Sequence, residues 1–114
     1  MLKKPFLFFL LFALLLPWSF AYASLEINEI MYDLKTGSDE GREWVEIYNN
    51  GDVAVDVSKF RFFEGDTNHK IKLVQGDPSL VPKGYSVIAV DPVKFKLDFS
   101  NFAGNLFDSS FSLS

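Results

Sequence analysis

The hydrophobic positions of this chain fall into two patterns, one unbroken apolar run near the N-terminus and then a series of short alternating segments. Residues 6–16 are all apolar, and two lysines precede them. Residues 21–23 read Ala-Tyr-Ala, the small-x-small site at which signal peptidase cuts. This order is typical of an export signal, so we expect residues 1–23 to be a signal peptide helix that is cleaved after Ala23.

An uncleaved membrane anchor is the alternative interpretation of the same stretch, because residues 6–23 approach the length of a spanning helix. Pro17 and Ser19 interrupt the stretch, which favours cleavage. The chain has no cysteine, so a lipid anchor on an acylated cysteine is excluded. We expect contact with the membrane only in transit, through the signal peptide, and a secreted or envelope-exposed protein.

Alternation of apolar and polar residues predicts strands along the rest of the chain. Residues 25–32 form the first, with a phase shift at Ile30 as a β-bulge would produce. The clearest strand follows a polar loop and carries Trp44 to Tyr48, ending in a turn at residues 49–52. Further strands are expected around the remaining alternating segments, which are residues 53–57, 60–63, 70–73, 85–90 and 110–114.

The strand at residues 85–90 is apolar enough to be the central buried one. Asp91 and Pro92 then give the one good helix start, an N-cap followed by proline at the first helical position, with about two turns over residues 93–99. Strands spaced by regular turn signals predict one all-β domain over residues 24–114, an antiparallel β-sandwich.

Charge and composition narrow the functions open to this domain. Without residues 1–23, nine basic and fifteen acidic residues remain, which gives a net charge of −6. Such an acidic surface disfavours the phosphate backbone, so nucleic acid is not an expected partner. Because no cysteine is present, burial of apolar side chains has to stabilise the domain.

Five segments together resemble the lamin tail domain, an immunoglobulin-like module of nuclear lamins and of many bacterial and archaeal exported proteins. They are residues 27–33, 42–51, 56–60, 81–85 and 108–113, of which 43–51 is the most specific because it combines a strand, its aromatic anchor and its exit turn.

The sequence departs from the family in two places. Lys59-Phe60 stands where the family usually has Gly-Trp, which suggests a repacked corner. Family members also continue past Leu113 with another hairpin. The resemblance therefore implies a C-terminally truncated domain, a fragment that lacks its last strands. Such a sandwich would have an unpaired strand edge and an uncovered apolar face.

His69 is the only histidine, and we expect it in a solvated turn. One histidine without cysteine is a poor basis for a zinc site or a nucleophilic triad. Residues 66–70 also fail the calcium-loop template at its fifth and sixth positions. Glu43 and Glu46 lie three apart on a strand and point to opposite faces, which excludes a glycosidase pair.

Two groups of side chains leave an alternative open. The acidic loop from Asp33 to Glu43, with Asp39 and Glu40, could take calcium, but solvated carboxylates are the favoured interpretation. Three aromatic residues could form an exposed platform for a sugar or a partner, although core positions are favoured for them, namely Trp44, Tyr48 and Phe60.

The sequence thus assigns no catalytic, cofactor-binding or metal-binding residue and no cofactor, and an enzyme is not expected. We expect a non-catalytic exported interaction module for cell-surface adhesion or scaffolding, whose partner is a protein or a polysaccharide. The alternative is an N-terminal accessory domain of a longer exported nuclease or other hydrolase. Members of the family are known to occur next to such catalytic domains.

Overall fold

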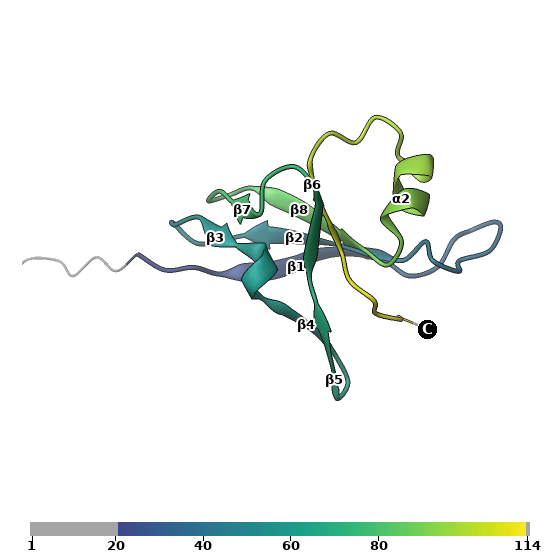
Figure 1. The fold of residues 1–114 in the computed structure, drawn as a ribbon, viewed down its shortest axis with the longest axis horizontal. Coiled ribbons are helices and arrows are strands. Elements are labelled where there is room, and N and C mark those ends of the chain that lie inside the picture. The colour runs from purple at the N-terminus through teal and green to yellow at the C-terminus, as the bar shows by residue number, and fades with distance from the viewer. Residues whose placement is uncertain (1–20, 114) are drawn as a thin grey trace, which may run out of the picture.

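The computed structural model describes residues 21–113, so the expected signal peptide lies outside the described residues except for its last three positions. The described chain is mostly β-strands in sheets with one short helix, a sandwich-like all-β arrangement (Figure 1). Its elements are β1 (Leu25–Met31), β2 (Trp44–Asn49), β3 (Val55–Asp56), the 3₁₀ turn η1 (Val57–Lys59), β4 (Arg61–Glu64), β5 (Thr67–Lys70), β6 (Lys72–Gln75), β7 (Ser79–Leu80), β8 (Tyr85–Ala89), α2 (Pro92–Asp98) and β9 (Asn105–Asp108).

Five strands form the main sheet in the order β1-β2-β8-β9-β6, and the pairs β3–β7 and β4–β5 form two small sheets. β8 lies third of the five, which confirms the prediction of a central strand. β8 and β9 are parallel, however, so the prediction of a purely antiparallel sandwich is wrong. The helix α2 carries the chain back along the sheet between them, and such a crossover joins parallel strands.

The predicted bulge in the first strand is confirmed. The register of β1 against β2 shifts between Ile27 and Glu29, so that Asn28 is the extra residue. Ile27 pairs with Ile47 before the bulge and Ile30 pairs with Val45 after it. Both isoleucines therefore share the face of the sheet on which Val45 and Ile47 are buried.

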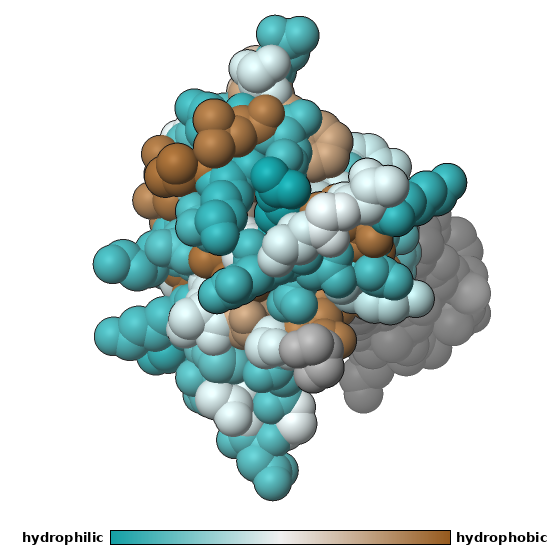
Figure 2. All heavy atoms as spheres, turned by 90° about the vertical axis from the view of Figure 1, so that its right-hand side faces the viewer, coloured by the Kyte–Doolittle hydropathy of each residue, from teal (hydrophilic) through white to brown (hydrophobic). Residues whose placement is uncertain are grey.

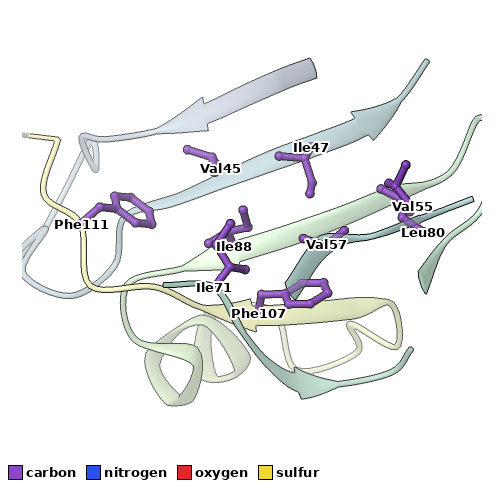
Figure 3. Packing of buried hydrophobic residues seen from close by; sticks show 9 residues of the cluster. All are labelled: Val45, Ile47, Val55, Val57, Ile71, Leu80, Ile88, Phe107 and Phe111. Carbon is purple, nitrogen blue, oxygen red and sulfur yellow. The ribbon is translucent and has the colours of Figure 1, made fainter. Parts of the chain in front are cut away.

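The main core lies on this inner face and is closed by β3, β7 and the chain around Ile71 (Figure 3). Its nine buried members are all apolar: Val45, Ile47, Val55, Val57, Ile71, Leu80, Ile88, Phe107 and Phe111. Each such side chain contributes roughly 1.5–3 kcal/mol by leaving water. The ring of Phe111 also stacks on that of Phe62, with centroids 4.5 Å apart.

The opposite, outer face of the sheet is covered at one end by α2. Asp91 caps this helix, because its Oδ1 accepts hydrogen bonds from the backbone N–H groups of Val93 (3.0 Å) and Lys94 (3.2 Å), as the sequence predicts. Phe95 packs inward from the helix and makes a T-shaped contact with the Trp44 ring at a centroid distance of 5.9 Å. This second, smaller cluster anchors α2 to the sheet.

Other segments differ from the sequence expectations for local reasons. Val57 is buried but begins a 3₁₀ turn, because Asp56 Oδ1 accepts from the Ser58 N–H (3.0 Å) and turns the backbone out of the strand. The alternation at residues 70–73 spans two strands separated at Ile71. The strand β7 has only two residues, too few to show a period.

Residues 110–113 alternate like a strand in sequence but form none in the structure. The Phe111 N–H donates to the Ser109 carbonyl oxygen (3.0 Å), and two further backbone donors of this segment bind carboxylates instead of a neighbouring strand. The Ser112 N–H donates to Glu64, and the Leu113 N–H donates to Glu43 Oε2 at 2.9 Å. These side chains satisfy the backbone groups that a strand partner would otherwise satisfy.

Candidate functional site

The inner face of β1 contains apolar residues that remain uncovered. Ile27 is 55% exposed, whereas its cross-strand partner Ile47 is 5% exposed. Ile30 is 49% exposed, whereas its partner Val45 is completely buried. The second layer of the sandwich therefore covers β2 and stops short of β1.

An open groove of about 260 Å³ runs along this uncovered face, which we call the β1–β4 groove. Its walls are apolar side chains from β1 and from the chain around β4, namely Leu25, Ile27, Phe60, Phe62 and Phe63. Ile47, Ile71 and Ile88 also line it, so the groove reaches down to the main core. Phe63 is 67% exposed and forms an apolar rim.

The outer edge of β1 has no strand beside it among residues 21–113. β1 is the first strand of the sheet and pairs only with β2. An edge strand presents a row of backbone N–H and C=O groups that can pair with another chain. The groove and the free edge thus adjoin along the same strand.

Three carboxylates lie on the other face of β1 and β2. Glu46 Oε1 accepts from Asn28 Nδ2 (2.7 Å), and Glu26 Oε1 accepts from Asn50 Nδ2 (3.0 Å). Glu29, which pairs with Glu46 in the ladder, is exposed. Within residues 21–113 no lysine, arginine or histidine forms an ion pair with these three groups, so their negative charges stay uncompensated.

The three aromatic residues considered as a possible binding platform, Trp44, Tyr48 and Phe60, lie in three different environments. Trp44 packs against Phe95 and Phe99 under α2 and is partly buried, as expected of a core residue. Tyr48 is half-buried and its ring lies on that of Tyr85, with centroids 4.8 Å apart. Phe60 is exposed and lines the β1–β4 groove, so the expectation of a core position is wrong for it.

His69 lies in β5 and not in a turn, and its side chain is only 12% exposed, so the expectation of a solvated turn residue is wrong. Its Nδ1 lies 3.4 Å from Ser110 Oγ, and its Nε2 lies 3.6 Å from Glu64 Oε1. The two-residue turn at Gly65-Asp66 could have revealed this position, because it sets Phe62 opposite His69.

Ser110, His69 and Glu64 contain the three types of side chain that form a nucleophilic catalytic triad. An activated serine lies within about 2.6–3.2 Å of its base, and both distances here are longer. Glu64 is also engaged by the Ser112 backbone. We interpret the trio as the contact by which the hairpin β4–β5 holds the segment after β9, and assign it no catalytic role.

The acidic loop does not bring its carboxylates together. Asp39 Oδ1 accepts a hydrogen bond from the Leu34 N–H (2.8 Å), which closes the loop on itself. Glu43 Oε2 instead accepts a hydrogen bond from the Leu113 N–H. Glu43 and Glu46 have different partners and do not face each other. Among residues 21–113, no three acidic or histidine side chains are grouped as a metal site would require.

The helix α2 forms another exposed apolar surface. Val93 and Leu97 are 72% and 74% exposed, and the face that contains the helix has an apolar area in its upper part (Figure 2). In the part of the chain that the structure describes, no helix is both long and apolar enough to cross a membrane.

Comparison with known proteins gives no match. No protein-family model, curated protein or solved structure matches this chain.

Proposed function

We propose that residues 24–114 form a non-catalytic interaction module of the cell surface, an immunoglobulin-like sandwich of the lamin tail type that binds a protein or a polysaccharide in adhesion or scaffolding. Residues 1–23 would direct its export as a cleaved signal peptide. The family assignment is supported by the motifs at residues 27–33 and 43–51, which fall on β1 and on β2 with its exit turn.

One observation carries the proposal, namely the β1–β4 groove beside a free strand edge. An exposed apolar surface of this kind in a domain with an otherwise closed core is typical of an interaction site. Small-molecule pockets are typically about 300–1,000 Å³ and enclose most of their ligand, whereas the β1–β4 groove has about 260 Å³ and is open to solvent.

Binding of the purified chain to cell-envelope material of its source organism tests the proposal. Phe63→Ser removes a large aromatic side chain that is 67% exposed in the free protein, and it should weaken binding about fivefold or more, because a few large side chains that a partner buries carry most of the affinity. Val93→Ser is the matched control, since Val93 is equally apolar and exposed but lies on α2. It should bind as the wild type does.

The proposal would be overturned if the wild-type chain bound neither the protein nor the polysaccharide fraction of the envelope, or if Phe63→Ser and Val93→Ser weakened binding equally. Export is tested separately by N-terminal sequencing of the protein from culture medium or envelope, where the first residue should be Ser24. A first residue other than Ser24 would contradict cleavage after Ala23.

A further inference from the structure

We propose that the free edge of β1 accepts an extended segment of another protein, in which apolar residues alternate with lysine or arginine, as an additional strand of the five-stranded sheet. The inference rests on the proposed interaction function and names its site and the chemistry of its partner. It follows from three properties of β1 that coincide along one strand.

The first property is the free row of backbone groups. β1 has seven residues, and its ladder goes to β2 alone among the described strands. An added strand obtains its affinity from main-chain hydrogen bonds along such an edge, and its specificity from the side chains at alternate positions.

The second property is an apolar surface on the inner face of β1, on both sides of the bulge at Asn28. Ile27 and Ile30 both point to the inner face and both are about half exposed. Phe63 lies across the β1–β4 groove from β1. Every second side chain of an added strand would enter this side, so apolar residues are required there.

The third property is the charge on the other face. The remaining side chains of an added strand would lie beside Glu26 and Glu29 of β1, and Glu46 lies one strand farther away on β2. None of these three carboxylates has a cationic partner among residues 21–113. Lysine or arginine at these positions would supply the missing counter-charge, and opposite charges on neighbouring strands stabilise a sheet.

The same carboxylates disfavour a second copy of the chain as the occupant. Pairing of two β1 strands about a two-fold axis keeps each face of the sheet continuous, so Glu26 and Glu29 of both copies would gather on one face. Like charges on adjacent strands are destabilising. The net charge of −6 on residues 24–114 adds to the repulsion.

A set of three synthetic peptides tests the inference on the purified processed chain. The first alternates lysine with valine over the length of β1, the second replaces each lysine by glutamate, and the third is the lysine peptide with alternate backbone nitrogens methylated. We expect the lysine peptide to bind and to slow hydrogen exchange in the β1 amides. The glutamate peptide should bind about tenfold more weakly or worse, and the methylated peptide likewise, because it cannot complete the ladder.

Two charge reversals identify the site. Glu29→Lys should weaken binding of the lysine peptide about threefold to tenfold, since an attraction becomes a repulsion at an exposed pair. Asp66→Lys changes the net charge equally but lies at the exposed tip of the β4–β5 hairpin, which extends away from the sheet (Figure 1). It should change the affinity less than about twofold.

Equal weakening by both reversals, or protection from exchange at amides outside β1, would overturn the inference. So would a concentration-dependent dimer with protected β1 amides in the absence of peptide, which would make a second copy the occupant. If no peptide binds while the wild-type chain still binds envelope material and Phe63→Ser does not, this inference fails and the proposed function stands. If the wild-type chain binds neither, both fail.

Discussion

Ile27 and Ile47 face each other across adjacent strands, yet one is half exposed and the other is buried. Each isoleucine follows an apolar residue and a glutamate in the sequence, and both side chains point to the same face of the sheet. What differs is the second layer, which covers β2 and leaves β1 open. Alternation in a sequence therefore identifies the face of a strand, whereas coverage of that face depends on segments far away in the chain.

The strongest test of this difference compares two phenylalanines. Phe107 is completely buried in the main core, and Phe107→Ala should lower the free energy of unfolding by about 3–5 kcal/mol, through lost burial and a cavity. Phe63 is mostly exposed at the groove, and Phe63→Ala should change the free energy of unfolding by about 0.5 kcal/mol or less. Urea unfolding followed by circular dichroism measures both. Equal losses would mean that the groove is closed in solution.

The cross-strand pair itself gives the second test. Ile47→Ala should cost about 2–5 kcal/mol of unfolding free energy, as expected for a buried isoleucine. Ile27→Ala should cost less than about 1 kcal/mol, because half of the side chain is already in water. The same urea titration compares the two variants. A cost at position 27 close to that at position 47 would show that another segment or molecule covers β1.

A polar residue sharpens the comparison inside the closed region. Asn49 is completely buried, and its Nδ2 donates to the backbone oxygens of Val53 (2.9 Å) and Leu80 (3.0 Å). Asn49→Ala should cost about 1–3 kcal/mol, because both carbonyl groups lose their donor in the interior. The exposed Asn68 provides the control, and Asn68→Ala should leave the thermal unfolding temperature nearly unchanged. A small effect at Asn49 would indicate that water reaches this corner.

The smallest expected effect concerns the cover of the outer face. Asp91→Ala removes the two hydrogen bonds that cap α2 and should cost about 1 kcal/mol. Asp91→Ser retains an acceptor at the N-cap and should recover most of the loss, which differential scanning calorimetry can resolve. If serine rescued nothing, the charge of Asp91 and not its hydrogen bonds would be the important contribution.

The sequence predicted elements whose signals are local. The bulge in β1, the aromatic strand β2, the central strand β8 and the capped start of α2 are all confirmed. In each of these segments the periodicity or the capping residues lie within a few positions of one another. Such signals do not require knowledge of which distant segment packs on the element.

The remaining errors concern partners that are distant in sequence. The parallel pairing of β8 with β9 was missed, although a strand followed by a helix and a further strand is the usual signature of a parallel crossover. The candidate site could not be located either, because the exposure of Ile27 and Phe60 depends on where the second layer ends. Likewise, only the folded chain brings His69 near Ser110.

The position of β9 between β8 and β6 also sets the order in which the protein can assemble. β6 has no neighbour in the sheet except β9, which is the last strand of the described chain to be synthesised. A nascent chain can form the β1–β2 hairpin early, but residues 72–75 have no partner until Asp108 has emerged. Completion of the sheet is therefore postponed until nearly the whole described domain has been synthesised.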